Sequence, residues 1–219
     1  MLKNKAKPSF KKNPSLLVVL IAGSATTALA LGARSTMGIF LDPVSDGLGL
    51  GTGSFALMVA VQNLIWGIGQ PIAGGLADRF GTRRVLVVGA VIYAGGLLVL
   101  AEATGPMGLH VGGGVLMGVG MAAASFSVVL AAIGRLVEES RRSFALGVAT
   151  AAGSIGQFTL IPLARILIEA TSWETAMLVM AGLTALIIVF CVPLRDPEKS
   201  GENQGAEIGE DETLREVFA

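Results

Sequence analysis

Reactive side chains are scarce in this sequence of 219 residues, which contains one cysteine and one histidine. Cys191 lies in an apolar run and can form no disulfide within the chain, so we expect it to pack as a small hydrophobic residue. A serine nucleophile needs a base beside it, and His110 lies near the opposite end of a neighbouring span from Ser154, so a serine hydrolase is not expected. No His, Cys or carboxylate residues cluster at the spacing that holds a metal ion. The sequence therefore predicts neither an enzyme nor a metal site.

A nucleotide-binding loop is also missing. The glycines Gly112, Gly113, Gly114, Gly118 and Gly120 do not follow the Gly-x-Gly-x-x-Gly spacing, and they have no strand–helix–strand context. Gly114 and Gly118, four residues apart, instead predict close packing between helices. No cofactor is expected.

Charged residues are few as well, at 15% of the chain, whereas soluble domains carry about 25%. The formal net charge of zero gives no reason to expect a nucleic acid as partner. Hydrophobic residues make up 53% and gather in runs of about 20 or more, the length that crosses a bilayer. The sequence predicts six such spans, over Ser15–Leu41, Ser54–Ala73, Val85–Ala103, Met107–Ile133, Ser143–Ile168 and Trp173–Val192.

The basic residues indicate how these spans cross the membrane. Lysines precede the first span and arginines follow the second, fourth and sixth, whereas the three opposite loops contain neither Lys nor Arg. By the positive-inside rule both termini are expected in the cytoplasm, in a cell (inner) membrane crossed six times. The predicted regions are a basic cytoplasmic N-terminus (1–14), a six-helix transmembrane domain (15–194) and an acidic cytoplasmic tail or truncated central linker (195–219).

A charged stretch separates the second and third spans and reads Gly-Gly-Leu-Ala-Asp-Arg-Phe-Gly-Thr-Arg-Arg over Gly74–Arg84. It is expected to be a short loop, in which Gly81 can take a positive φ and let the chain reverse within few residues. Two spans joined so tightly are antiparallel neighbours. An ordinary basic cytoplasmic loop would account for the arginines, but not for Asp78 among them.

This stretch resembles the signature loop between helices 2 and 3 of the major facilitator superfamily, which reads Gly-x-Leu-Ala-Asp-Arg-x-Gly-Arg-Arg. The matching residues are Gly74, Leu76, Ala77, Asp78, Arg79, Gly81 and Arg83, while Thr82 stands where a basic residue is more usual. The resemblance implies an all-α membrane protein whose six transmembrane helices form one half (a 3+3 repeat) of a major facilitator fold, here the N-terminal half. In that superfamily the aspartate holds the cytoplasmic ends of the helices together in the outward-open state. The resemblance therefore implies a gating motif of Gly74, Asp78, Arg79, Gly81, Arg83 and Arg84.

Three further phrases resemble the branch of oxalate/formate antiporters and monocarboxylate transporters. They are Arg34-x-x-x-Gly38-x-Phe40-x-x-Pro43, Gln62-Asn63-Leu64-x-Trp66-Gly67-x-x-Gln70-Pro71, and Gly153 to Gln157 with Pro162 and Trp173. The chain departs from the branch around Leu48 and Leu50, where a tryptophan is usual. It also has Gly114 where many superfamily members carry an arginine that hints at proton coupling. In that branch important basic residues for the substrate come from the second six-helix half, which we expect this sequence to lack.

Polar side chains inside the expected spans are the candidates for substrate binding, namely Arg34, Gln62, Asn63, Trp66, Gln70, Gln157 and Arg165. Arg34 and Arg165 are the only charged residues in the cores of the expected spans, and Arg34 should lie roughly 10 Å of helix rise short of the outer end of the first. A cation within the membrane has a high free-energy cost, so such a residue is a candidate for function by default. A guanidinium can pair with a carboxylate through two parallel hydrogen bonds. Two alternatives stay open: the arginines snorkel to the outer headgroups, or the amides bond between helices without a ligand.

These observations favour a secondary transporter, or its N-terminal half, that moves a small organic anion such as a mono- or dicarboxylate by alternating access. The expected partners are the lipid bilayer, the anion, and a second six-helix half or another copy of the chain. The alternative is a truncated, non-transporting six-span protein that acts as a partner or a remnant.

Overall fold

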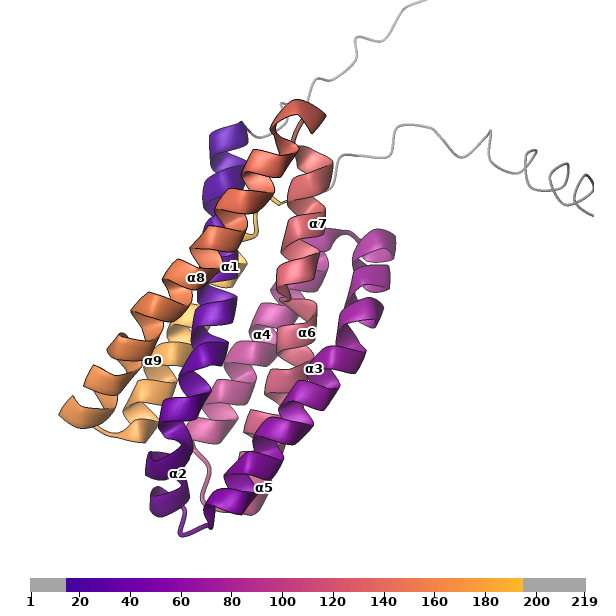
Figure 1. The fold of residues 1–219 in the computed structure, drawn as a ribbon. Coiled ribbons are helices and arrows are strands. Elements are labelled where there is room, and N and C mark those ends of the chain that lie inside the picture. The colour runs from indigo at the N-terminus through magenta and orange to yellow at the C-terminus, as the bar shows by residue number, and fades with distance from the viewer. Residues whose placement is uncertain (1–14, 195–219) are drawn as a thin grey trace, which may run out of the picture.

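A computed structural model describes residues 15–194, and over that range the chain forms helices and no strand (Figure 1). Six segments are long and apolar enough to cross a membrane, which confirms the predicted number. They are Leu16–Gly47, Thr52–Phe80, Thr82–Ala101, Pro106–Leu136, Glu139–Ala170 and Trp173–Phe190. The predicted basic N-terminus and acidic tail lie outside the described residues.

The first span is longer than the sequence predicts. It consists of α1 (Leu16–Ser35), the 3₁₀ helix η1 (Thr36–Phe40) and α2 (Leu41–Gly47), so the expected outer loop from Asp42 is helical for one and a half further turns. Arg34 therefore lies 18 residues after the start of the span and 13 before its end. Thirteen residues correspond to about 20 Å of helix rise, and the first charged residue beyond Arg34, Asp42, lies eight residues or about 12 Å further along the helix.

The predicted charged loop between the second and third spans is mostly helix, so that expectation is wrong. α3 (Thr52–Phe80) continues to Phe80 and α4 begins at Thr82 (Thr82–Ala101), which leaves Gly81 alone between them. Its φ of 92° is in the region that glycine adopts without steric cost, as predicted. The reversal is so short that the charges of Asp78 and Arg79 project from the last turn of α3.

The fourth span is broken, whereas the sequence predicts one continuous helix over Met107–Ile133. It begins with α5 (Pro106–Gly108) and the π-helix η2 (Leu109–Leu116), continues as α6 (Met117–Ala123), and restarts as α7 (Phe126–Leu136). Between α6 and α7, Ser125 adopts an extended conformation and its hydroxyl accepts a hydrogen bond from the backbone N–H of Val128. Side-chain capping of this kind allows a helix to begin at membrane depth, because it satisfies an amide that lipid cannot.

The fifth span is one continuous helix, α8 (Glu139–Ala170), and the sixth consists of α9 (Trp173–Ala185) and the single turn α10 (Ile187–Phe190). Ser172 caps the start of α9 by accepting from the N–H of Thr175. α8 crosses α1 along much of its length, and α4 lies against both α6 and α9 (Figure 1).

Small residues allow the helices to approach closely. A Cβ added at Gly156 of α8 would overlap the carbonyl of Ala28 in α1, and one at Gly32 would lie 2.8 Å from the carbonyl oxygen of Gly156. In lipid the helices gain no hydrophobic free energy from association, so such close van der Waals contact is the main attraction between them.

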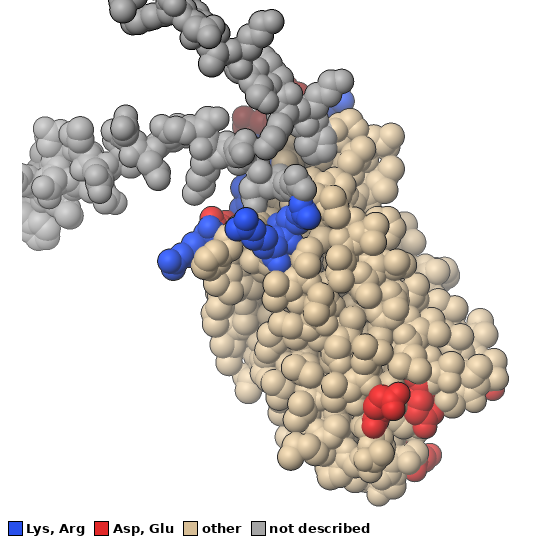
Figure 2. All heavy atoms as spheres, turned by 180° about the vertical axis from the view of Figure 1, so that it is seen from behind, with Lys and Arg blue, Asp and Glu red and all other residues tan. Residues whose placement is uncertain are grey.

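Charge is distributed unequally between the two ends of the bundle. Figure 2 shows Lys and Arg gathered at one end, together with a few Asp and Glu, and a group of Asp and Glu at the other end. The turns at the basic end carry Arg79, Arg83, Arg84, Arg135, Arg141 and Arg142. The acidic end carries Asp42, Asp46, Glu102, Glu169 and Glu174, with Arg165 as its only cation among residues 15–194.

The glycine crossing gives a stability prediction. Gly156→Ala should destabilise the bundle by about 1–3 kcal/mol, because the new methyl group meets backbone that cannot move aside. Gly147→Ala on the same helix is the matched control: its Cβ meets no atom within 4 Å, and helix propensity favours alanine by up to about 1 kcal/mol. Unfolding in mixed detergent, followed by circular dichroism, measures both. Equal stability of the two variants would contradict a tight crossing at Gly156.

Candidate functional site

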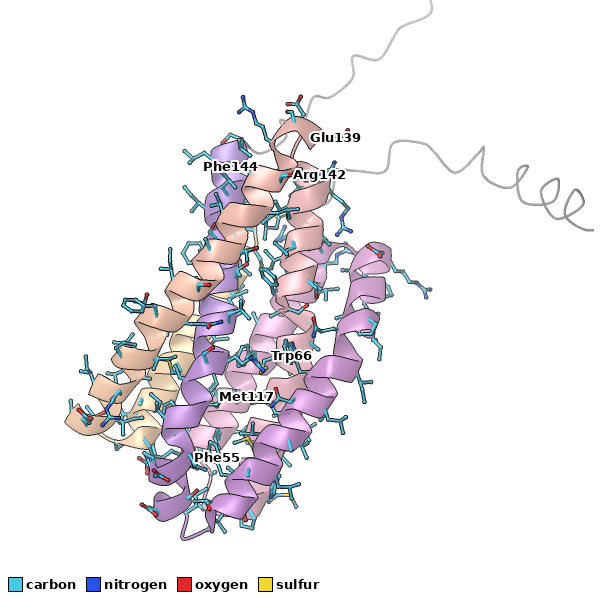
Figure 3. The ribbon with its side chains drawn as sticks, viewed as in Figure 1. Phe55, Trp66, Met117, Glu139, Arg142 and Phe144 are labelled. Atoms are coloured by element: carbon cyan, nitrogen blue, oxygen red, sulfur yellow. The ribbon has the colours of Figure 1, made fainter. Side chains whose placement is uncertain are left out.

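Arg34 contacts the second span in two ways. Its terminal nitrogen Nη2 donates a hydrogen bond of 2.9 Å to Oδ1 of Asn63, and its guanidinium lies 4.3 Å from the centroid of the Trp66 ring. Asn63 is oriented for this contact because its Nδ2 donates to the carbonyl of Val59 one turn earlier. Trp66 lies centrally between α1 and α3 (Figure 3). A cation on an indole face gains about 2 kcal/mol when desolvated, which offsets part of the cost of placing Arg34 in the membrane.

No carboxylate of residues 15–194 forms an ion pair with Arg34. The side chain is half-buried, and its contacts with Asn63 and Trp66 direct the guanidinium toward the second span and not along the helix toward the headgroups. The structure therefore places a half-buried cation at mid-span, held by an amide and an aromatic ring and not by an opposite charge.

A small cavity lies beside Arg34. Its volume is about 10 Å³, about the space of one water molecule. Trp66, Tyr93 and the break in the fourth span form its walls together with Arg34, and the lining residues are Ala30, Leu31, Arg34, Trp66, Tyr93, Met121, Ala124, Ser125 and Phe126. Elements far apart in sequence (α1, α3, α4 and both parts of the fourth span) thus meet at Arg34.

Gln62, another of the predicted candidates, lies away from this group. It is buried, and its Nε2 donates 2.8 Å to the carbonyl of Gly113 and contacts Sδ of Met117 at 3.6 Å. Gly113 is in the π-helix η2, where widened hydrogen bonding can leave a carbonyl for a side chain. Gln62 therefore joins two helices, as in the alternative that needs no ligand.

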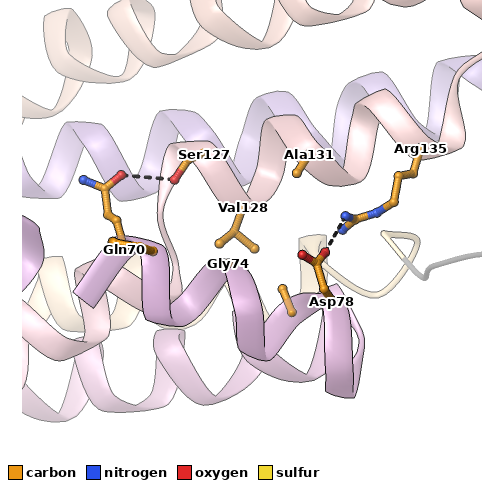
Figure 4. Close-up of a pocket in the computed structure, with 9 residues that line it drawn as sticks. Gln70, Gly74, Asp78, Ser127, Val128, Ala131 and Arg135 are labelled. Atoms are coloured by element: carbon orange, nitrogen blue, oxygen red, sulfur yellow. Dashed lines mark hydrogen bonds and ion pairs between the residues drawn. The ribbon is translucent and has the colours of Figure 1, made fainter. Parts of the chain in front are cut away.

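A groove between α3 and α7 holds the remaining candidates of the second span. Figure 4 shows two polar contacts across it, Ser127 Oγ to Gln70 Oε1 at 3.1 Å and Arg135 Nη1 to Asp78 Oδ1 at 3.0 Å. Both contacts join residues 57 apart in sequence, so the two helices run parallel in one register. The groove has a volume of about 390 Å³, and Gly74, Ala77 and Ala131 are among its lining residues.

The partner of Asp78 differs from the expected ones. The sequence places Arg79 and Arg83 within its reach, but the ion pair is with Arg135 from the end of the fourth span, which also donates to Thr82 Oγ1 at 2.5 Å. Arg79 instead lies over the Phe80 ring, 5.3 Å from its centroid. The side chains of Arg135 and Asp78 are 36% and 70% exposed, so the pair contributes at most about 1 kcal/mol to stability.

Arg165 and Gln157 on α8 are not brought to Arg34. Nε of Arg165 lies 2.8 Å from Oε1 of Glu169, one turn further on, and both side chains are more than 60% exposed. Arg165 is five residues from the end of its span, where a long side chain reaches the membrane surface. Gln157 is half-buried beside Gly156, near the crossing with α1.

Three residues of these contacts were not singled out from the sequence. Ser127 and Tyr93 are isolated polar groups in apolar runs, and their position beside Gln70 and Arg34 depends on helix packing. Arg135 could have been found, because it follows the fourth span at the same membrane face as Asp78.

Comparisons with known proteins give the chain a family. Residues 23–218 match the model of the Major Facilitator Superfamily. Monocarboxylate transporter 13 of Rattus norvegicus is 27% identical over 180 residues, 82% of this chain and 41% of the relative. Monocarboxylate transporter 3 of Rattus norvegicus is 30% identical over 167 residues (76% and 34%), and monocarboxylate transporter 12 of Xenopus laevis is 32% identical over 127 residues (58% and 27%). The chain spans less than half the length of these relatives.

Proposed function

Because this chain belongs to the major facilitator superfamily, we propose that it forms the N-terminal half of a secondary transporter that moves a small monocarboxylate by alternating access. The observation that carries the proposal is Arg34, a cation near the middle of a membrane span that has no carboxylate partner among residues 15–194. A bound organic anion would supply the missing opposite charge.

The geometry around Arg34 supports a carboxylate as ligand. A guanidinium has five N–H donors in a planar fork, and Asn63 accepts from only one of the two terminal nitrogens. Trp66 covers one face of the fork, so an anion would approach its edge. Two parallel N–H···O bonds to a carboxylate fit that edge, and lysine could not reproduce them. The names of the relatives, all monocarboxylate transporters, support the same substrate class.

Alternating access requires two units that rock about a shared site, so we propose that a second six-helix half, on the same or another chain, completes the transporter. Asn63, Trp66, Gln70 and Gln157 are all incompletely buried in this domain, which leaves polar groups for a facing unit to cover. Polar groups left against lipid are unfavourable, and this favours association.

The gating role of the signature motif is a proposal too. Gly74, Asp78, Arg79, Gly81, Arg83 and Arg84 lie at the basic end of the bundle, and Asp78 with Arg135 joins the second span to the fourth there. An exposed ion pair adds little stability, so it can break and re-form as the helix ends move, which is what a latch requires.

The distribution of charge supports the proposed orientation. The basic end, with the turns at Gly81 and between α7 and α8, faces the cytoplasm together with both termini, and the protein resides in the cell (inner) membrane.

Anion binding tests the proposal at Arg34. In a Trp173→Phe background Trp66 is the only one of the two tryptophans left, and it reports on the guanidinium beneath it. Acetate should change its emission in nanodiscs; Arg34→Lys should raise the Kd about tenfold (about 1.4 kcal/mol), and Arg34→Gln should abolish the response. Arg165→Gln is the control: Arg165 pairs with Glu169 and lies away from Arg34, so this variant should bind acetate normally. Equal binding by all four chains would remove Arg34 from the proposed site.

Transport tests the latch. In liposomes that hold the chain with a co-expressed second half, Asp78→Asn should slow uptake of labelled acetate severalfold at equal insertion, because the neutral amide holds Arg135 more weakly than the carboxylate does. Asp46→Asn, an exposed carboxylate at the acidic end, is the matched control and should transport normally. The chain alone should insert but transport nothing. Unchanged uptake by Asp78→Asn would refute the latch, and specific uptake by a verified monomer would refute the need for a second half.

Accessibility of single cysteines tests the orientation. In a Cys191→Ala background, Gly51→Cys should react with an impermeant maleimide on intact cells and Arg84→Cys only after permeabilisation, because the two exposed positions lie at opposite ends of the bundle. The reverse pattern would overturn the proposed topology.

A further inference from the structure

Tyr93 on α4 carries a polar group that the proposed site does not use. Its side chain is fully buried, and its hydroxyl has no hydrogen-bond partner among residues 15–194. A buried hydroxyl without a partner is unfavourable, and phenylalanine would fill the same space without that cost. The presence of tyrosine here therefore calls for a contact made by its hydroxyl.

Arg34 supplies a second polar atom in the same condition. Its Nε is buried and has no partner among the described residues, while Nη2 bonds to Asn63. Arg34 and Tyr93 line the same cavity of about 10 Å³. Nε–H can only donate, whereas a phenolic hydroxyl both donates and accepts, so one water molecule in that cavity would satisfy both.

Tyr93 is held rigidly enough to serve as an anchor. A Cβ added at Gly120 of α6 would overlap the backbone of Tyr93, so α4 and α6 are in direct contact at this residue. One turn earlier, Gly89 packs equally closely on Ala123 and Ala124, where the fourth span breaks. The backbone that carries Tyr93 is therefore fixed relative to both parts of the fourth span.

We propose that Tyr93 is a positioning residue for Arg34, which it holds through one buried water that accepts from Nε and is shared with the tyrosine hydroxyl. Asn63 then restrains one corner of the guanidinium, Trp66 its face and Tyr93 its inner edge. The remaining N–H donors of the guanidinium then face the anion, and the plane of the guanidinium is already fixed before the anion binds. This lowers the entropy cost of ordering the Arg34 side chain on binding. The effect on anion binding rests on the proposed function, whereas the link between Tyr93 and Arg34 does not.

The link is tested by the Nε–H signal of Arg34 in a ¹⁵N-arginine NMR spectrum of the full chain in nanodiscs, assigned by its loss in Arg34→Lys. In the unmodified chain the proton should exchange slowly with solvent, and Tyr93→Phe should shift the signal and speed exchange at least tenfold. Thr26→Val is the matched control, because it removes another fully buried, unpartnered hydroxyl that does not line the cavity. An Nε–H signal that Tyr93→Phe leaves unchanged in position and exchange would overturn the proposal.

Acetate titration by Trp66 emission then separates this proposal from the function it builds on. Tyr93→Phe should raise the Kd about fivefold, Thr26→Val should not, and in the Arg34→Lys background Tyr93→Phe should have no further effect because the Nε–H is gone. If no chain binds acetate but the Nε–H signal moves, the proposed function fails and the link stands. If acetate binding requires Arg34 but Tyr93→Phe changes neither the signal nor the Kd, the link fails alone.

Discussion

A guanidinium near the middle of the first span, with no opposite charge beside it among residues 15–194, is the constraint around which the centre of this bundle is organised. The membrane makes such a charge costly, and the chain offsets the cost with an indole face and an amide oxygen, both weaker partners than a carboxylate. A carboxylate in the bundle would neutralise Arg34 permanently and compete with any anion. Partners that stabilise the charge without cancelling it would leave Arg34 free to pair with the proposed anion, whereas Arg165 is already paired with Glu169.

The broken fourth span is part of the same arrangement. A continuous helix from Met117 to Leu136 would present only side chains to Arg34 and no helix terminus. The break brings Ser125 and Phe126 to the cavity and places the start of α7, capped by the Ser125 hydroxyl, beside Arg34. Gly89 allows the break by letting α4 approach the backbone at Ala124. The irregular backbone is thus enclosed by protein, the condition under which it is tolerated in a membrane.

Much of the fold could be predicted from the sequence. Bilayer thickness sets the length of an apolar run that spans the membrane, and a glycine such as Gly81 between two spans favours a tight reversal of the chain. The ends of the helices could not, since α3 continues through the charged residues up to Gly81 and the first span continues past Pro43. Arg34, Asn63 and Trp66 were predicted as candidates, and the structure brings them together. The burial of Gln62 against Gly113 and the approach of Tyr93 depend on which helices pack together, and helical periodicity shows only which residues share a face.

The two contacts across the groove between α3 and α7 share one sequence offset, 57 residues, at Gln70 with Ser127 and at Asp78 with Arg135. If either helix slid or turned against the other, both pairs would lose alignment together. A small displacement of one helix along the other would break both hydrogen bonds and form no new one in their place. The two contacts therefore fix one register between α3 and α7 at the basic end of the domain, and a substitution at one contact should loosen the other, eight residues away.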